Sequence, residues 1–172
     1  MTTTTDLTDT ARLKMAACMA SGMEYLIQLH YIHRDLACRN CIPYPDHSVK
    51  VSFLSICEDL YHDDYYLLNN IPVPLRWLSP EAIQSEAYSE KSDVWSFGVT
   101  VWEMFSHGAT PYGDVRNDKV VQGVCKELRL TQPAGCPLAV YEVMQQCWLT
   151  DVNSRPTFLQ LTNMLNDINL PQ

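Results

Sequence analysis

The sequence "IHRDLACRN" at residues 32–40 decides how the rest of the chain is interpreted. Asp35 follows a histidine and an arginine, and Asn40 comes five residues later. Transfer of a phosphoryl group to a hydroxyl needs a carboxylate beside the nucleophile's proton and an amide oxygen for a metal ion. Asp35 suits the first role and Asn40 the second, so residues 32–40 are predicted to be a phosphoryl-transfer loop. The simpler alternative is a turn at a helix end, in which Asp35 is a capping residue.

The composition excludes several classes of protein. The chain has 172 residues, of which 47% are hydrophobic and 19% charged, as expected for one domain with a packed core. Its net charge of -8 disfavours binding to nucleic acid or to an anionic membrane surface. The sequence contains neither an apolar run long enough to span a bilayer nor an opening secretion signal. We therefore expect no nucleic-acid partner, and membrane attachment only through a span outside this chain.

The spacing of apolar residues predicts a mainly α-helical fold. Residues 1–10 are polar and rich in threonine, which indicates a flexible lead-in. Thr8, Asp9 or Thr10 can cap the helix that follows. Apolar residues then recur at roughly helical spacing, namely Leu13, Met15, Met19, Met23, Leu26 and Leu29.

The remaining elements are predicted in the same way. Residues 48–54 have the alternation of a short strand, and the turn-forming sequence 43–48 precedes them. Residues 57–74 are acidic and tyrosine-rich, which predicts a long surface loop. The segment 92–108 is apolar nearly all round, so we expect a buried helix that Gly108 ends. Two amphipathic helices follow, with Leu138, Tyr141, Val143, Met144 and Cys147 as inner positions of the first, and Phe158, Leu161 and Leu165 of the second, whose first turn is expected to hold Pro156.

The seven cysteines indicate reduced thiols. Their number is odd, and they are scattered along the chain. Cys38 and Cys41 form a C-x-x-C pattern that lacks both a βαβ redox context and a second pair for zinc. Ordinary reduced thiols of a cytosolic domain are therefore the expectation.

Several motifs together resemble the protein kinases of the tyrosine-kinase branch. In "HRDLACRN", Arg39 precedes the asparagine as it does in tyrosine kinases. The sequence "PVPLRWLSPEAI" at 72–83 resembles the end of an activation segment, with residues 79–81 in place of A-P-E. "SDVWSFGVTVWEMFSHGATPY" and "CWLTDVNSRPTF" match the central and last helices of such domains. The resemblance covers nearly everything between residues 11 and 168.

This resemblance implies the large, helical C-terminal lobe of a kinase-like fold, with a short β-hairpin region. Residues 1–10 are then a lead-in, residues 11–168 the lobe and residues 169–172 a tail. The catalytic loop is expected at 32–40 and the activation segment at 53–81. The six glycines form no G-x-G-x-x-G pattern, so we expect the N-terminal lobe, which cradles the nucleotide phosphates, to be missing.

The resemblance also assigns roles to individual residues. Asp35 takes the position of the catalytic base, and Arg39 and Asn40 complete a catalytic set that is either vestigial or residual. His33, Glu81, Asp93 and Arg155 have structural roles. Glu81 is expected to pair with Arg155, and Asp93 is expected to accept backbone hydrogen bonds from the catalytic loop.

The metal-binding triplet D-F-G of the family corresponds here to Phe53-Leu54-Ser55. A phenyl ring cannot bind Mg²⁺, which requires oxygen ligands. The nearest acidic residues, at 58–59, would replace the lost ligand only if the preceding strand shifted by several residues. We therefore expect a degenerate metal site with no metal ion and no nucleotide cofactor. ATP and Mg²⁺ would bind only if Asn40 alone holds a residual metal.

Tyr61, Tyr65 and Tyr66 resemble the Y-x-x-x-Y-Y cluster in the activation loops of receptor tyrosine kinases. Their acidic neighbours suit recognition by another tyrosine kinase, and phosphorylation would create docking sites for phosphotyrosine-binding modules. The alternative is that they are merely exposed aromatic residues of a loop.

The degenerate triplet and the motifs around it resemble the off-track or protein tyrosine kinase 7-like receptor pseudokinases, with Ryk-type and Ror-type receptors as other candidates. The resemblance implies an inactive interaction or scaffold module in Wnt and planar-polarity-type signalling, with signalling proteins as partners. It would lie at the cytoplasmic face of the plasma membrane as part of a longer receptor, or in the cytoplasm if this chain is complete. A residually active protein tyrosine kinase and a truncated, non-functional gene product are the alternatives.

Overall fold

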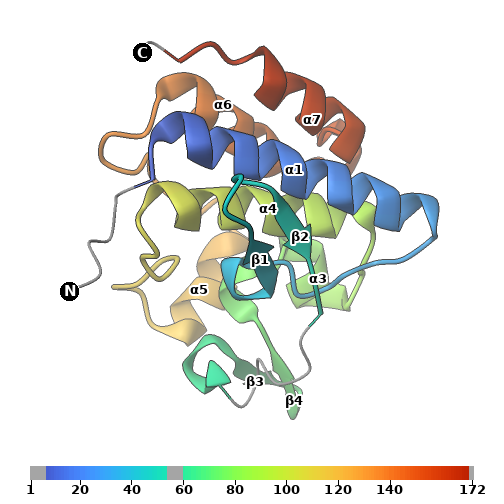
Figure 1. The fold of residues 1–172 in the computed structure, drawn as a ribbon. Coiled ribbons are helices and arrows are strands. Elements are labelled where there is room, and N and C mark those ends of the chain that lie inside the picture. The colour runs from blue at the N-terminus through green and yellow to red at the C-terminus, as the bar shows by residue number, and fades with distance from the viewer. Residues whose placement is uncertain (1–6, 54–59, 171–172) are drawn as a thin grey trace.

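The fold is mainly helical, as predicted. A computed structural model describes residues 7–53 and 60–170 of the chain. Figure 1 shows the helices gathered around α4, with β1 and β2 near the middle of the view and β3 and β4 at its lower edge. The helices are α1 (Asp9–Gln28), α3 (Pro80–Ser85), α4 (Glu90–Phe105), α5 (Asn117–Val124), α6 (Leu138–Cys147) and α7 (Phe158–Asp167).

Two antiparallel hairpins complete the fold. β1 (Cys41–Pro43) pairs with β2 (Val49–Val51), in the region where the sequence predicts a strand and a turn. β3 (Tyr66–Leu68) pairs with β4 (Ile71–Val73). The second hairpin adds two short strands to the long surface loop that the sequence predicts over residues 57–74. Pro72 lies inside β4, and a proline within a segment argues against a strand.

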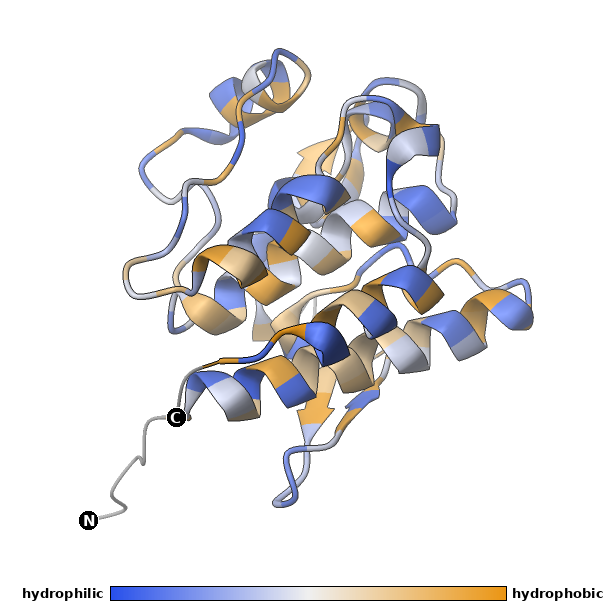
Figure 2. Ribbon diagram, turned by 90° about the horizontal axis from the view of Figure 1, so that it is seen from above, coloured by the Kyte–Doolittle hydropathy of each residue, from blue (hydrophilic) through white to orange (hydrophobic). Residues whose placement is uncertain are grey.

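The core is built around α4. Trp95, Phe97 and Val99 on this helix are completely buried. α1 packs against α7 and against β2, and α4 packs against α6. Figure 2 shows hydrophobic positions, in orange, and hydrophilic positions, in blue, alternating along the helix ribbons. Burial of apolar side chains between the helices therefore supplies the main stabilisation.

Side chains and a glycine set the ends of the helices. Thr8 caps α1, because its hydroxyl accepts a hydrogen bond from the backbone of Ala11 at 3.2 Å. α4 starts two residues earlier than predicted, since Ser89 and Ser92 form a capping box at its start. After α4, Gly108 adopts a φ of +80° and its N–H bonds to the carbonyl of Glu103 at 2.9 Å, a C-terminal stop of the predicted kind.

Three predicted positions in the helices were wrong. Leu138 is 61% exposed at the first residue of α6, and Val140 is the buried residue of that turn. Leu29 lies beyond the end of α1 and is 59% exposed. Pro156 precedes Thr157, the N-cap of α7, and so lies outside the helix. Each error falls at a helix end, where periodicity is a weak guide.

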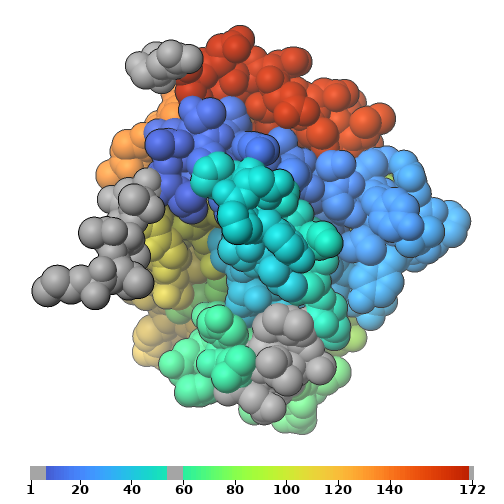
Figure 3. Space-filling model, in the orientation of Figure 1, coloured from blue at the N-terminus to red at the C-terminus, as the bar shows by residue number. Residues whose placement is uncertain are grey.

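The first hairpin lies on the surface next to α1, where Figure 3 shows it in cyan between α1 and the green segment that carries β3 and β4. Loop 32–40 lies beside this hairpin and is largely buried. Across residues 7–53 and 60–170, no helix combines the length and the apolarity that crossing a bilayer requires.

Candidate functional site

The backbone of loop 32–40 is held by Asp93 from α4. The N–H groups of His33 and Arg34 donate to the two carboxylate oxygens of Asp93 at 2.7 and 2.9 Å. Arg34 has a φ of +69°, in the left-handed region that non-glycine residues rarely adopt. Burial raises the pKa of Asp93, and the two N–H donors oppose this rise by favouring the carboxylate. Asp93 is thus placed to hold a strained backbone in position.

His33 links this loop to the residue before the degenerate triplet. The ring is buried, and its Nε2 lies 3.0 Å from the carbonyl oxygen of Ser52. Its Nδ1 accepts the backbone N–H of Asp35 at 3.3 Å. The two contacts together fit the tautomer with the proton on Nε2.

The carboxylate of Asp35 is surrounded by hydrogen-bond donors. Arg39 forms an ion pair with Oδ1. Oδ2 accepts the hydroxyl of Tyr65 at 2.6 Å and the side-chain amide of Asn40 at 3.0 Å. The side chain of Asp35 is only 12% exposed. The residue predicted to be the base is therefore in place, but its carboxylate oxygens already accept hydrogen bonds from side chains of the same chain.

Arg39 is the centre of this cluster. Its guanidinium lies 4.4 Å from the Trp77 ring centre and 4.9 Å from that of Tyr65. A further contact of 3.3 Å reaches the carboxylate of Asp64. Burial would lower the pKa of Arg39, but the charge of Asp35 and the contacts with Tyr65 together outweigh burial and raise the pKa. Arg39 thus joins the catalytic loop to the predicted activation segment.

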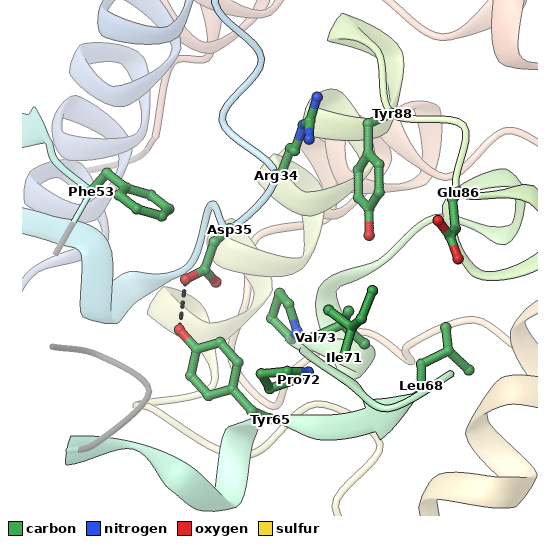
Figure 4. A pocket seen from close by; sticks show the side chains of 11 residues that line it. Arg34, Asp35, Phe53, Tyr65, Leu68, Ile71, Pro72, Val73, Glu86 and Tyr88 are labelled. Atoms are coloured by element: carbon green, nitrogen blue, oxygen red, sulfur yellow. Dashed lines mark hydrogen bonds between the residues drawn. The ribbon is translucent and has the colours of Figure 1, made fainter. Parts of the chain in front are cut away.

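Tyr65 reaches Asp35 from the turn before β3. Figure 4 shows its ring pointing toward the carboxylate. Burial, and then the hydrogen bond to Asp35, raise the pKa of the Tyr65 hydroxyl. A substrate hydroxyl would have to meet Asp35 at this position. Of the other two predicted phosphorylation candidates, Tyr61 is 45% exposed and Tyr66 is half-buried at the start of β3.

The metal position does not fit Mg²⁺. Phe53 follows β2 and is 58% exposed, with its ring 5.9 Å from that of His33. The phenyl group offers no oxygen ligand. The side-chain nitrogen of Asn40 donates to the carbonyl of Asp35 at 2.7 Å as well as to its carboxylate. Leu54 and Ser55 lie outside the described residues.

The predicted pairing of Glu81 with Arg155 is present. The guanidinium contacts both carboxylate oxygens, at 2.6 and 2.9 Å, and its other donors reach the carbonyls of Leu149 and Lys91 at 2.9 Å. The Arg155 side chain is fully buried. Burial alone would raise the pKa of Glu81, but Arg155 lowers it overall. This pair ties the end of the activation segment to the region before α7.

Glu103 on α4 was missed by the sequence analysis. Its carboxylate accepts the indole N–H of Trp77 at 2.7 Å and the backbone N–H of Cys38 at 3.2 Å. Burial raises its pKa to about 7, although both donors oppose the shift. A single acidic residue in the apolar sequence "VTVWEMF" was the signal that could have identified it.

A cavity of about 370 Å³ lies beside Asp35 and Tyr65. Arg34 and Tyr88 form part of its wall, with the guanidinium 5.2 Å from the ring centre. Leu68 and the residues of β4 form much of the rest. Tyr65 itself therefore lines the space in front of the base position.

Comparison with known proteins decides the family. The family described as protein tyrosine and serine/threonine kinase matches residues 2–165. The chain belongs to this kinase family. Its helical fold is accordingly that of the C-terminal lobe of a kinase domain, as the sequence predicts.

Individual relatives of this kinase lobe include proteins described as inactive and proteins described as receptors. "Inactive tyrosine-protein kinase 7" of Homo sapiens is 44% identical over 157 residues, which are 90% of this chain and 15% of the relative. The "Tyrosine-protein kinase transmembrane receptor Ror" of Drosophila melanogaster is 40% identical over 154 residues, 89% of this chain and 22% of the relative. The insulin receptor of Xenopus laevis is 39% identical over 156 residues, 90% of this chain and 12% of the relative. The chain thus spans less than a quarter of the length of these relatives.

Proposed function

We propose that the chain is a pseudokinase lobe of a receptor-type protein and acts as a signalling interaction module. The observation that carries this proposal is Phe53, whose side chain has no atom that can bind a metal ion. It follows β2 and lies beside a loop that keeps Asp35 and Asn40. Metal ions and positioning groups supply nearly all of the catalysis in phosphoryl transfer. Loss of the principal Mg²⁺ ligand should therefore reduce transfer by several orders of magnitude.

The contacts around Asp35 support the same proposal. Its carboxylate binds Arg39, Asn40 and Tyr65, so a substrate hydroxyl has to displace Tyr65 first. The pairs that hold the shape of the lobe are retained, as the bonds to Asp93 and the Glu81–Arg155 pair show. An interaction module needs only the maintained shape, whereas a kinase also needs the metal ligand that Phe53 does not provide.

Signalling proteins are the proposed partners. Tyr61 is exposed beside acidic residues, which suits phosphorylation by another tyrosine kinase and then capture by a phosphotyrosine-binding module. A location at the cytoplasmic face of the plasma membrane and a role in Wnt or planar-polarity-type signalling rest on analogy with the protein tyrosine kinase 7-like receptors.

A residually active tyrosine kinase is the second candidate, because Asp35, Arg39 and Asn40 are all retained. The test is phosphate incorporation from Mg-ATP by the longest natural product that contains residues 1–172, with Asp35→Asn as the matched control. The pseudokinase proposal predicts the same background incorporation for both proteins. Incorporation that Asp35→Asn abolishes would overturn it.

A further inference from the structure

A small cavity rich in sulfur lies on the side of the lobe where α1, α4 and the first hairpin meet. Its volume is about 170 Å³. Met15 and Met19 line it from α1, and Met104 lines it from α4. Cys38 and Cys41 contribute two thiols. Residues four apart share one face of a helix, so both methionines of α1 face the cavity together.

The C-x-x-C pattern brings both cysteines to this cavity. Cys38 begins the 3₁₀ turn Cys38–Asn40, and Cys41 begins β1, so one tight turn separates them. The Sγ atom of Cys41 lies 3.5 Å from the Sδ atom of Met19. The Sγ atom of Cys38 lies 3.6 Å from the carbonyl oxygen of Thr100, which also lines the cavity. A thiol and a thioether from separate elements are therefore already in contact.

The donor atoms select among the cations. Mg²⁺ and Ca²⁺ require oxygen ligands, which this lining does not supply from carboxylates. In residues 7–53 and 60–170, no three His, Cys, Asp or Glu side chains converge on one metal position, as a zinc site would require. Two thiolates with neighbouring thioethers are instead the soft donor set that favours Cu(I).

We propose that Cys38, Cys41 and Met19 form a Cu(I) site in this cavity. The site shares Cys38 with loop 32–40 and lies on the side of that loop that faces α1. A bound ion would link α1 directly to the turn that carries Arg39 and Asn40. It would also give the C-x-x-C pattern a role other than that of ordinary thiols.

The test is an anaerobic titration of the 172-residue chain with Cu(I), in competition with the chromophoric chelator bicinchoninate. We expect one Cu(I) per chain. Cys38→Ser and Cys41→Ser should each weaken binding by about 100-fold, and Met19→Leu by about 10-fold. Cys18→Ser removes a thiol of α1 that does not line this cavity, so it should keep the wild-type affinity. Equal losses in all three serine variants, or no loss in any of them, would overturn the proposal.

A spectroscopic measurement on the unmodified chain avoids any effect of the substitutions on folding. X-ray absorption at the copper edge should show a first coordination shell made of sulfur alone. A shell containing nitrogen or oxygen donors would place the copper elsewhere and would overturn the assignment.

Discussion

The hydroxyl of Tyr65 donates a hydrogen bond to Oδ2 of Asp35 at 2.6 Å, and Arg39 contacts both residues. Loop 32–40 and the predicted activation segment are thereby joined at the carboxylate of Asp35, the predicted base position. A hydrogen bond to a charged group contributes about 1.5–3 kcal/mol. The closed arrangement of the segment around β3 therefore depends substantially on one tyrosine.

Tyr65→Phe should loosen this segment without unfolding the lobe. The substitution removes the hydroxyl and keeps the ring that packs against Arg39. Amide hydrogen exchange over residues 60–74 should become about tenfold faster, because loss of the hydrogen bond lowers the free energy of local opening by roughly 1.4 kcal/mol or more. The matched control is Tyr61→Phe, on an exposed side chain, which should leave exchange unchanged. Equal exchange in the two variants would show that the bond to Asp35 does not hold the segment.

Glu81→Ala should strongly destabilise the lobe. It leaves the fully buried guanidinium of Arg155 without its carboxylate, and breaking such a pair from one side costs about 3–5 kcal/mol. Urea unfolding followed by circular dichroism gives the free energy of unfolding. A double variant, Glu81→Leu with Arg155→Met, should recover part of the loss, since it leaves no unpaired charge.

A surface pair provides the control for that experiment. Arg116 and Asp118 are 3.1 Å apart, and their side chains are 83% and 43% exposed. Arg116→Ala should therefore change the free energy of unfolding by less than about 1 kcal/mol. A loss in Glu81→Ala no larger than this would contradict the structural role given to the buried pair.

Glu103 should make the lobe less stable as the pH rises. Its pKa is about 7 in the folded chain against an ordinary value of 4.5, so between these values the folded chain binds a proton that the unfolded chain releases. The stabilisation is complete below pH 4.5 and is lost as the pH rises through about 7. The groups that face this carboxylate are Trp77, the Cys38 N–H, Arg39 and Asp64.

Glu103→Gln should flatten this pH dependence. The free energy of unfolding, measured between about pH 5 and 8, should fall with pH in the wild type by up to about 1 kcal/mol per pH unit, and fall less in the variant. Glu142→Gln, on the exposed side of α6, should retain the wild-type slope. An unchanged slope in Glu103→Gln would show that another group titrates.

The sequence predicted the contacts that support loop 32–40, because each depends on a residue type at a fixed spacing. Asp93 and the Glu81–Arg155 pair lie where the family resemblance implies. The β3–β4 hairpin was not recognised, since Pro72 lies within β4 and a proline argues against a strand. Its closure onto Asp35 depends on tertiary contacts of Tyr65 and Arg39 that no local pattern encodes.

The buried polar network was the other part that sequence could not supply. In the sequence, Glu103 is one acidic residue in an apolar helix. Only the structure shows that it accepts hydrogen bonds from Trp77 and Cys38. Cys38 and Cys41 likewise read as ordinary thiols until α1 brings Met19 beside them. Residues far apart in sequence meet in both cases.

The most direct test of the central claim is the effect of Mg²⁺ on nucleotide binding by the longest natural product that contains this chain. Isothermal titration calorimetry with ATP, carried out once in the presence of Mg²⁺ and once in the presence of EDTA, measures the two affinities. Because Phe53 provides no metal ligand, the account predicts equal affinities, or no binding, under the two conditions. Binding that Mg²⁺ strengthens tenfold or more, and that Asn40→Ala abolishes, would contradict the account.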